Sequence, residues 1–118
     1  MRLYFTILVI LLALLTSCNT PVEQANALRE QQPTIKNGLL YSGDGKTLPL
    51  RKWKPTQKKK PSATIIALHG FNDYSRAFND SARYFAKHNI VTYAYDQRGF
   101  GTSGQTGIWA GKQNLHLD

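Results

Sequence analysis

Apolar residues fall into short runs along this chain, and the run at residues 63–68 gives the clearest structural signal. All six residues are apolar or β-branched, with Thr64 the only polar one. Such a run is too short for a buried helix and is typical of a strand covered on both faces, as in parallel sheets. The chain then turns at His69-Gly70. The pattern therefore predicts a buried strand that ends at a glycine turn.

The residues after this turn follow helical periodicity. Between residues 75 and 88, apolar or small side chains recur every four positions, with polar residues between them. Asn89 suits a left-handed helix end, and residues 90–95 form the next apolar run. Strand, helix and strand in this order predict a right-handed βαβ unit and hence a parallel strand pair.

Two further strands are predicted ahead of this unit. Residues 39–42 and 47–54 flank the turn at Asp44-Gly45, which is a strong hairpin signal between apolar runs. Pro49 cannot donate to a strand ladder, so we expect the hairpin to lie toward a sheet edge. The expected class is α/β, with an antiparallel hairpin followed by a parallel βαβ unit.

The N-terminus has the pattern of a targeting segment. Residues 3–15 are apolar apart from Thr6 and follow a basic start, as in a secretory signal. This run is too short to span a bilayer, which needs about 20 residues. Leu15-Thr16-Ser17-Cys18 resembles the bacterial lipobox, which implies cleavage after residue 17 and lipidation of Cys18. The expected location is then the cell envelope, with the exported protein anchored in a membrane. The alternative is an ordinary signal peptide followed by a free thiol.

Composition supports one small folded domain behind this segment. The chain has 118 residues, of which 42% are hydrophobic and 19% charged, and its single cysteine excludes an intrachain disulfide. Residues 18–37 are rich in Gln, Asn and Pro, with scattered apolar residues, and predict a polar tether. We therefore expect a signal peptide at 1–17, a tether at 18–37 and a domain at 38–118.

The turn after the central strand suggests an anion-binding loop. A strand, a glycine turn and a helix start can direct backbone N–H groups at developing negative charge. His69-Gly70-Phe71 in this position resembles the oxyanion loop of α/β-hydrolases, in the monoacylglycerol lipase, lysophospholipase and serine aminopeptidase branch. Residues 44–55 resemble the opening of the same branch. The resemblance implies that the Phe71 amide is one oxyanion donor and that the residue after the nucleophile supplies the other.

A second glycine motif follows residue 95. Gly99-x-Gly101-x-x-Gly104 formally matches the dinucleotide fingerprint, and Asp118 lies near the expected acidic position. That fingerprint should open a helix directly, whereas residues 105–111 contain two more glycines and no apolar stripe. The stretch instead resembles the D-x-R-G-x-G-x-S turn after the fourth strand of α/β-hydrolases. This resemblance gives structural roles to the residues that match the turn: Asp96, Arg98, Gly99, Gly101 and Ser103. No cofactor is expected.

No residue of this chain qualifies as a nucleophile, acid or base. A nucleophile elbow needs a small residue two positions after its serine, whereas Gln105 follows Ser103. His69, His88 and His116 lack metal-like spacing, and the family's histidine follows its serine and acid. The catalytic residues are therefore expected downstream. We interpret the chain as the incomplete N-terminal part of an α/β-hydrolase, inactive alone, with the edge of the 63–68 strand left unpaired.

The net charge of +8 is concentrated in one region. Seven of the fifteen basic residues lie between positions 46 and 60: Lys46, Arg51, Lys52, Lys54, Lys58, Lys59 and Lys60. Nucleic-acid binding would use Trp53 as a stacking platform, but an exported protein does not normally meet nucleic acid, so no nucleic-acid partner is expected. A solvated loop is favoured, and contact with anionic lipid headgroups is the alternative.

The family resemblance and the N-terminal pattern together imply one function. The whole protein would be a membrane-anchored serine hydrolase that cleaves a carboxylic ester through an acyl-enzyme. Its substrate would be an acyl ester or a similar lipid-like small molecule. The alternative is a non-catalytic, lipid-anchored binding module that uses the basic loop.

Overall fold

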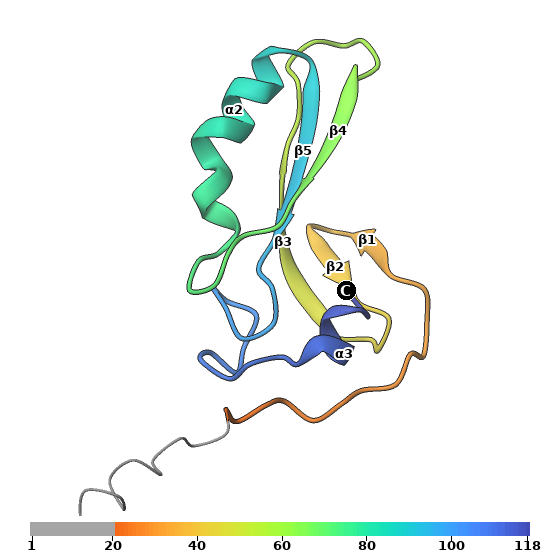
Figure 1. Cartoon of the computed structure of the whole chain (residues 1–118). Coiled ribbons are helices and arrows are strands. Elements are labelled where there is room, and N and C mark those ends of the chain that lie inside the picture. The colour runs from red at the N-terminus through yellow and green to blue at the C-terminus, as the bar shows by residue number, and fades with distance from the viewer. Residues whose placement is uncertain (1–20) are drawn as a thin grey trace, which may run out of the picture.

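The computed structural model describes residues 21–118, which are organised around one five-stranded sheet (Figure 1). The strand order is β1-β2-β3-β5-β4. The strands are β1 (Thr34–Lys36), β2 (Leu39–Tyr41), β3 (Thr47–Trp53), β4 (Ala63–Ala67) and β5 (Ile90–Tyr95). The predicted signal peptide and Cys18 lie outside the described residues. Among those described, no helix combines the length and apolar character needed to cross a bilayer.

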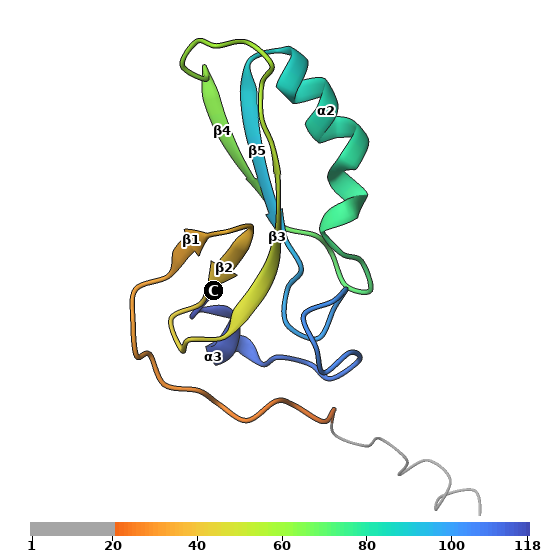
Figure 2. The same cartoon turned by 180° about the vertical axis from the view of Figure 1, so that it is seen from behind.

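The βαβ unit forms as the sequence pattern predicts. A short 3-10 turn, η1 (Ser75–Phe78), leads into α2 (Asn79–Lys87), and β4 and β5 pair in parallel with Ile65 opposite Thr92. Figures 1 and 2 show α2 running alongside the sheet over β5. Asn89 ends the helix with φ of 61°. Its Nδ2 donates to the Lys60 carbonyl at 3.0 Å, which ties the helix end to the entry of β4.

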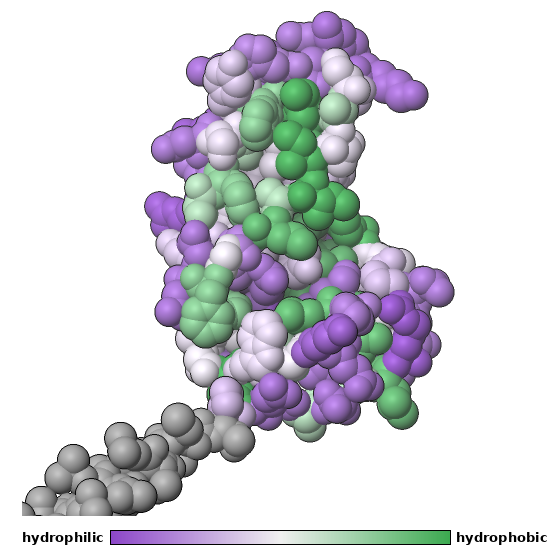
Figure 3. Space-filling model, viewed as in Figure 1, coloured by the Kyte–Doolittle hydropathy of each residue, from purple (hydrophilic) through white to green (hydrophobic). Residues whose placement is uncertain are grey.

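The expectation that residues 63–68 are covered on both faces is wrong. β4 pairs only with β5 among the described strands, so it lies at the edge of the sheet. Ile66 is 71% exposed and Leu68 58% exposed. Figure 3 shows a band of apolar side chains on the face of the molecule seen there. An apolar run in sequence shows that a strand can be buried, but the strand order decides whether it is. Among the described strands, the other edge of β4 has no partner.

The hairpin forms toward the β1 edge of the sheet, but neither of its strands is the edge strand. β3 lies inside the sheet, with β2 on one side and β5 on the other. Residues 47–49 pair with β2 and residues 50–53 pair with β5, so Pro49 sits where β3 changes partner. The Pro49 carbonyl accepts from the Asp96 N–H at 2.9 Å. A proline is tolerated there because its carbonyl is used and its missing N–H interrupts neither ladder.

Within the stretch 18–37 that was expected to serve as a polar tether, residues 21–37 are described, and they contact the domain. β1 pairs antiparallel with β2 through a turn at Asn37-Gly38, where φ is 53° and 74°. The Gln24 N–H donates to the Trp109 carbonyl at 2.9 Å, and the Ala27 N–H donates to Asn114 Oδ1 at 2.9 Å. This segment therefore runs alongside the last described residues, including the short helix α3 (Lys112–Leu115).

The buried centre of the sheet is small. Leu40, Leu48 and Tyr95 pack together, with Leu50 against them, where the hairpin meets the end of β5. Both parallel strands end beside this cluster. The loops that follow β4 and β5 therefore emerge at the same end of the sheet.

Candidate functional site

The loops after β4 and β5 are joined by a buried histidine. His69 Nε2 accepts a hydrogen bond from the Gln97 N–H at 3.0 Å, and Gln97 Nε2 donates to the His69 carbonyl at 2.6 Å. Because Nε2 accepts, the ring proton resides on Nδ1, which donates to the Gly70 carbonyl at 2.9 Å. The His69 ring is thus held by two hydrogen bonds. Together with the bond from Gln97 Nε2, the bond from the Gln97 N–H joins the two loops, and we call this pair of bonds the His69 clasp.

Phe71, the expected oxyanion donor, lies beyond this clasp at the open end of the parallel strands. Its side chain is 73% exposed, and its ring meets Phe100 edge-on at 5.3 Å between centroids. Phe100 in turn meets His69 at 5.6 Å. The Asp73 N–H closes the turn on the Gly70 carbonyl at 3.3 Å. Among the hydrogen bonds formed within residues 21–118, none has the Phe71 N–H as its donor.

An apolar cavity of about 450 Å³ adjoins this loop. Phe71 and Phe100 form part of its wall, and Val22 and Trp109 form another part. The N-terminal segment therefore contributes to the same surface as the predicted oxyanion loop. Sequence reasoning did not find this, because residues 22 and 71 are brought together only by the packing of residues 21–33.

Asp96 fastens the loop after β5 to the start of η1. Its Oδ1 accepts from the Ser75 N–H at 2.9 Å and the Ser75 hydroxyl at 2.5 Å, while Oδ2 accepts from the Thr102 N–H at 2.9 Å. Burial by itself raises the pKa of Asp96, but these hydrogen bonds outweigh it and hold the pKa below its usual value. The carboxylate is therefore a structural anion at neutral pH and is occupied by its neighbours.

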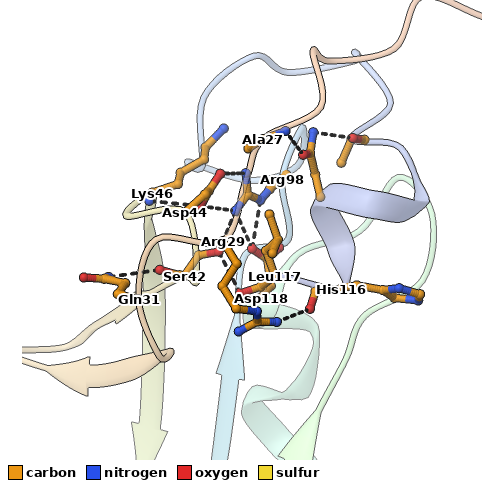
Figure 4. Close-up of polar contacts among 12 residues, drawn as sticks. Ala27, Arg29, Gln31, Ser42, Asp44, Lys46, Arg98, His116, Leu117 and Asp118 are labelled. Atoms are coloured by element: carbon orange, nitrogen blue, oxygen red, sulfur yellow. Dashed lines mark hydrogen bonds and ion pairs between the residues drawn. The ribbon is translucent and has the colours of Figure 1, made fainter.

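Arg98 holds together three segments that are distant in sequence (Figure 4). Its guanidinium donates to both oxygens of Asp44, at 2.7 and 2.6 Å, and to Asp118 Oδ1 at 2.8 Å. Nη2 also donates to the Ser42 hydroxyl at 2.6 Å. The hydrogen bond from Arg98 lowers the pKa of Asp44 well below its usual range. Burial lowers the pKa of Arg98, but its bonds to Asp44 and Asp118 raise the net value above normal.

These partners of Arg98 are residues that sequence reasoning missed. Asp44 was interpreted only as a turn residue, and Asp118 was weighed as the acidic residue of a dinucleotide site. Asp118 instead pairs with the arginine at the start of that motif. No local signal in the sequence identifies these pairs, because Asp44 and Arg98 lie in two separate glycine-containing turns and Asp118 follows α3.

Two glycines of the turn are required by their surroundings. Gly99 has φ of 81° and Gly101 has φ of 55°. A Cβ at Gly99 would collide with the Ile108 carbonyl oxygen, and a Cβ at Gly101 would collide with Asp96 Oδ2. Gly104 also has positive φ, but a Cβ there would meet open space. The loop after β5 does not open a helix, since α3 begins only at Lys112.

Ser103 lies buried in this turn, and its hydroxyl forms hydrogen bonds with the backbone of the turn. Its hydroxyl lies 2.8 Å from the Gln97 carbonyl and 2.7 Å from the Phe100 carbonyl, and it accepts from the Phe100 N–H at 3.3 Å. No histidine is among its partners. In the described part of the chain, no group of three or more His, Cys, Asp or Glu side chains is arranged to hold a metal ion.

Comparison with known proteins decides the family. A family model described as "Serine aminopeptidase, S33" matches residues 59–118, which include the His69 loop and the turn from Asp96 to Ser103. The chain belongs to this family. The fold agrees: an open-form lipase superposes with a TM-score of 0.56 at 22% identity, over 70% of this chain and 27% of the lipase. The architecture is that of the α/β-hydrolases.

Two curated relatives of this S33 chain are similar in sequence. An uncharacterized abhydrolase domain-containing protein of Dictyostelium discoideum is 41% identical over 64 residues, which is 54% of this chain and 7% of the relative. A putative monoglyceride lipase of Schizosaccharomyces pombe is 38% identical over 61 residues, which is 45% of this chain and 16% of the relative. The chain thus spans less than a fifth of the length of either relative.

Proposed function

We propose that the whole protein is a membrane-anchored serine hydrolase that cleaves a carboxylic ester of the monoacylglycerol or lysophospholipid type. The observation that carries this proposal is the Phe71 N–H, which lies at the carboxyl end of β4 without a hydrogen-bond partner in the described residues. The sequence similarity to a putative monoglyceride lipase supports the substrate class. The lipobox-like sequence ending at Cys18 supports an exported, lipid-anchored protein of the bacterial cell envelope.

In the proposed reaction, a serine Oγ attacks the ester carbonyl carbon and its proton passes to a histidine. The carbonyl oxygen becomes an oxyanion, which accepts from the Phe71 N–H and from the amide after the nucleophile. The histidine then protonates the departing alcohol, and water hydrolyses the acyl-serine with the same histidine as base. The role of this chain is to hold the Phe71 amide in place, through the hydrogen bonds of His69 and the packing of Phe100 against the His69 ring.

The serine, acid and histidine are proposed to come from sequence downstream of Asp118. Every serine of residues 21–118 is engaged without a histidine partner. Ser42 bonds to Arg98, Ser75 to Asp96, and Ser103 to the carbonyls of its own turn. Ser62 accepts from Asn89, and Ser81 bonds to the Phe78 carbonyl. Residues 18–118 alone are therefore expected to show no serine-dependent ester hydrolysis.

The test replaces the Phe71 amide by an ester in the whole enzyme, using the α-hydroxy analogue of phenylalanine at position 71. This change removes the N–H and keeps the side chain. Loss of one oxyanion donor is expected to lower kcat by about 10²–10³-fold. Phe71→Ala, which keeps the amide, is the control and should retain most of kcat. A kcat unaffected by the ester, with monoacylglycerol as substrate, would refute the role of this amide.

A second candidate function, a non-catalytic surface module, is favoured by one observation. Lys52, Lys54 and Lys59 border one groove of about 330 Å³, and Arg83 and Lys87 of α2 border another beside Lys52. In residues 21–118, none of these cations forms a salt bridge. If the protein is such a surface module, replacing Lys58, Lys59 and Lys60 by neutral residues should abolish its binding to anionic vesicles. Unchanged binding after that substitution would exclude it.

A further inference from the structure

One end of the molecule is strongly basic. The loop between β3 and β4 and the C-terminal end of α2 lie there, opposite the loops that follow β4 and β5 (Figures 1 and 2). Residues 45–72 and 81–95, which include both of these elements, contain no Asp or Glu. Figure 3 shows hydrophilic side chains gathered at this end. The basic residues of these stretches therefore have no carboxylate close in sequence to neutralise them.

A groove of about 490 Å³ lies at this end, between α2 and the end of β3. Four basic residues border it: Lys52, Lys54, Arg83 and Lys87. Trp53 forms part of the wall, and its Nε1 donates to Asn79 Oδ1 at 3.3 Å, which holds the indole between β3 and α2. The groove therefore combines several cations with one fixed aromatic wall.

Most of these cations are not offset by a partner. The Lys52 ammonium lies over the Tyr93 ring, 4.6 Å from its centroid, and so has a cation–π contact. In the described part of the chain, no salt bridge is formed by Lys54, Arg83 or Lys87. Arg83 and Lys87 are four residues apart on α2, and like charges at this spacing repel each other and destabilise a helix. An anion bound between them would remove this repulsion.

The groove lies away from the free edges of the sheet. Among the described strands, β3 has β2 on one side and β5 on the other, and only β1 and β4 have an unpaired edge. A strand contributed by other residues would therefore pair with β1 or β4 and would leave the groove open. Covering its unpaired cations with apolar side chains would be unfavourable, because each charge would lose its hydration. The groove is therefore suited to an anionic ligand from solution.

We propose that this groove binds a phosphate monoester: the three unpaired cations surround the phosphate, and the Trp53 indole contacts the organic part. A phosphate monoester carries about two negative charges and three strong acceptor oxygens, so it can accept from several donors at once. Arg83 offers a planar pair of N–H donors to two of these oxygens, and the Thr56 hydroxyl borders the same groove. This chemistry is shared by small soluble phosphate esters and by the headgroup of phosphatidic acid.

The experiment uses the whole protein carrying Cys18→Ser, so that no lipid is attached to it. Calorimetry measures its affinity for glycerol 3-phosphate and for vesicles that contain phosphatidic acid, and at least one of the two should bind. Binding should also change the tryptophan emission, and this change should be lost in Trp53→Phe. Acetate at the same ionic strength should not bind, because a carboxylate offers fewer acceptor oxygens and less charge.

A pair of double variants separates a defined site from general attraction to the basic end. Arg83→Gln with Lys87→Gln should weaken binding by about tenfold or more, because each change removes a charge-assisted hydrogen bond. Lys58→Gln with Lys60→Gln is the matched control: it lowers the net charge equally and alters residues of the β3–β4 loop that do not border the groove. The control should weaken binding by less than about threefold, because exposed charges at a distance are screened by salt.

Each outcome decides the proposal. Binding of glycerol 3-phosphate would identify a soluble ester as sufficient, and binding of phosphatidic acid vesicles alone would identify a lipid headgroup. No binding of either probe, or equal binding of acetate, would overturn the proposal. Equal losses in the two double variants would also overturn it, in favour of diffuse attraction. Ester hydrolysis by the Arg83/Lys87 double variant should equal that of the parent protein, so the proposed catalytic function is tested separately.

Discussion

Removal of the Arg98 guanidinium should be among the most destabilising single changes in this protein. Arg98→Met keeps much of the side-chain volume but leaves the carboxylates of Asp44 and Asp118 without their cation. The side chains of these three residues are 3%, 9% and 0% exposed. Removing one member of a buried ion pair typically costs about 3–5 kcal/mol, because the remaining charge stays desolvated. We expect Arg98→Met to lower the free energy of unfolding by an amount in this range. That is a large share of the roughly 5–15 kcal/mol by which an ordinary domain is stable.

Two further variants separate charge from geometry at this network. Arg98→Lys keeps a cation, so it should lower the free energy of unfolding less than Arg98→Met does. It should still be less stable than the parent protein, because lysine cannot form the two parallel hydrogen bonds to Asp44. Asp44→Asn leaves Arg98 paired with Asp118 and should cost about 1.5–3 kcal/mol, the usual value of hydrogen bonds to a charged group. Arg83→Met, on the exposed side of α2, is the matched control and should change stability by less than about 0.5 kcal/mol.

The assay is urea denaturation of each variant, followed by tryptophan fluorescence, at neutral and acid pH. The pKa of Asp44 is lowered in the folded state, so the unfolded state binds more protons as pH falls. The stability from this group is therefore complete above the ordinary carboxyl pKa and is lost as pH drops below it. The free energy of unfolding of Arg98→Met should therefore fall less steeply with decreasing pH than that of the parent protein. A stability within about 1 kcal/mol of the parent protein at neutral pH would refute the buried-pair reasoning.

Two other changes test the turn after β5. Gly99→Ala should cost clearly more than Gly104→Ala: both residues have positive φ, which costs about 1 kcal/mol for a side chain, but only the Cβ at 99 collides with the Ile108 carbonyl. Equal denaturation midpoints for the two would contradict this. Ser75→Ala removes the 2.5 Å bond to Asp96 and should cost about 1.5–3 kcal/mol. It should also raise the pKa of Asp96 as followed by carboxyl NMR, whereas Ser81→Ala should change neither quantity.

The local elements of this fold follow from local patterns, and the sequence predicts them well. The hairpin around Asp44-Gly45, the helix after Ser75 and its end at Asn89 depend on residues within a few positions of one another. The Asn89 end is a good example, because its left-handed φ of 61° is a property that asparagine tolerates wherever it occurs. Strand pairing within the βαβ unit follows in the same way, since the crossover forces the two strands to be parallel.

The sequence by itself determined the elements, the glycine turns and the position of the Phe71 loop after a strand. Only the tertiary structure decided that β4 lies at an edge and that residues 21–24 lie beside Trp109. It also decided that Arg98 pairs with Asp44 and Asp118, across separations of 54 and 20 residues. These contacts depend on which segments the whole sheet brings together. Polar side chains such as Gln24 and Asp44 have many possible partners, and the pattern around each one does not distinguish among them.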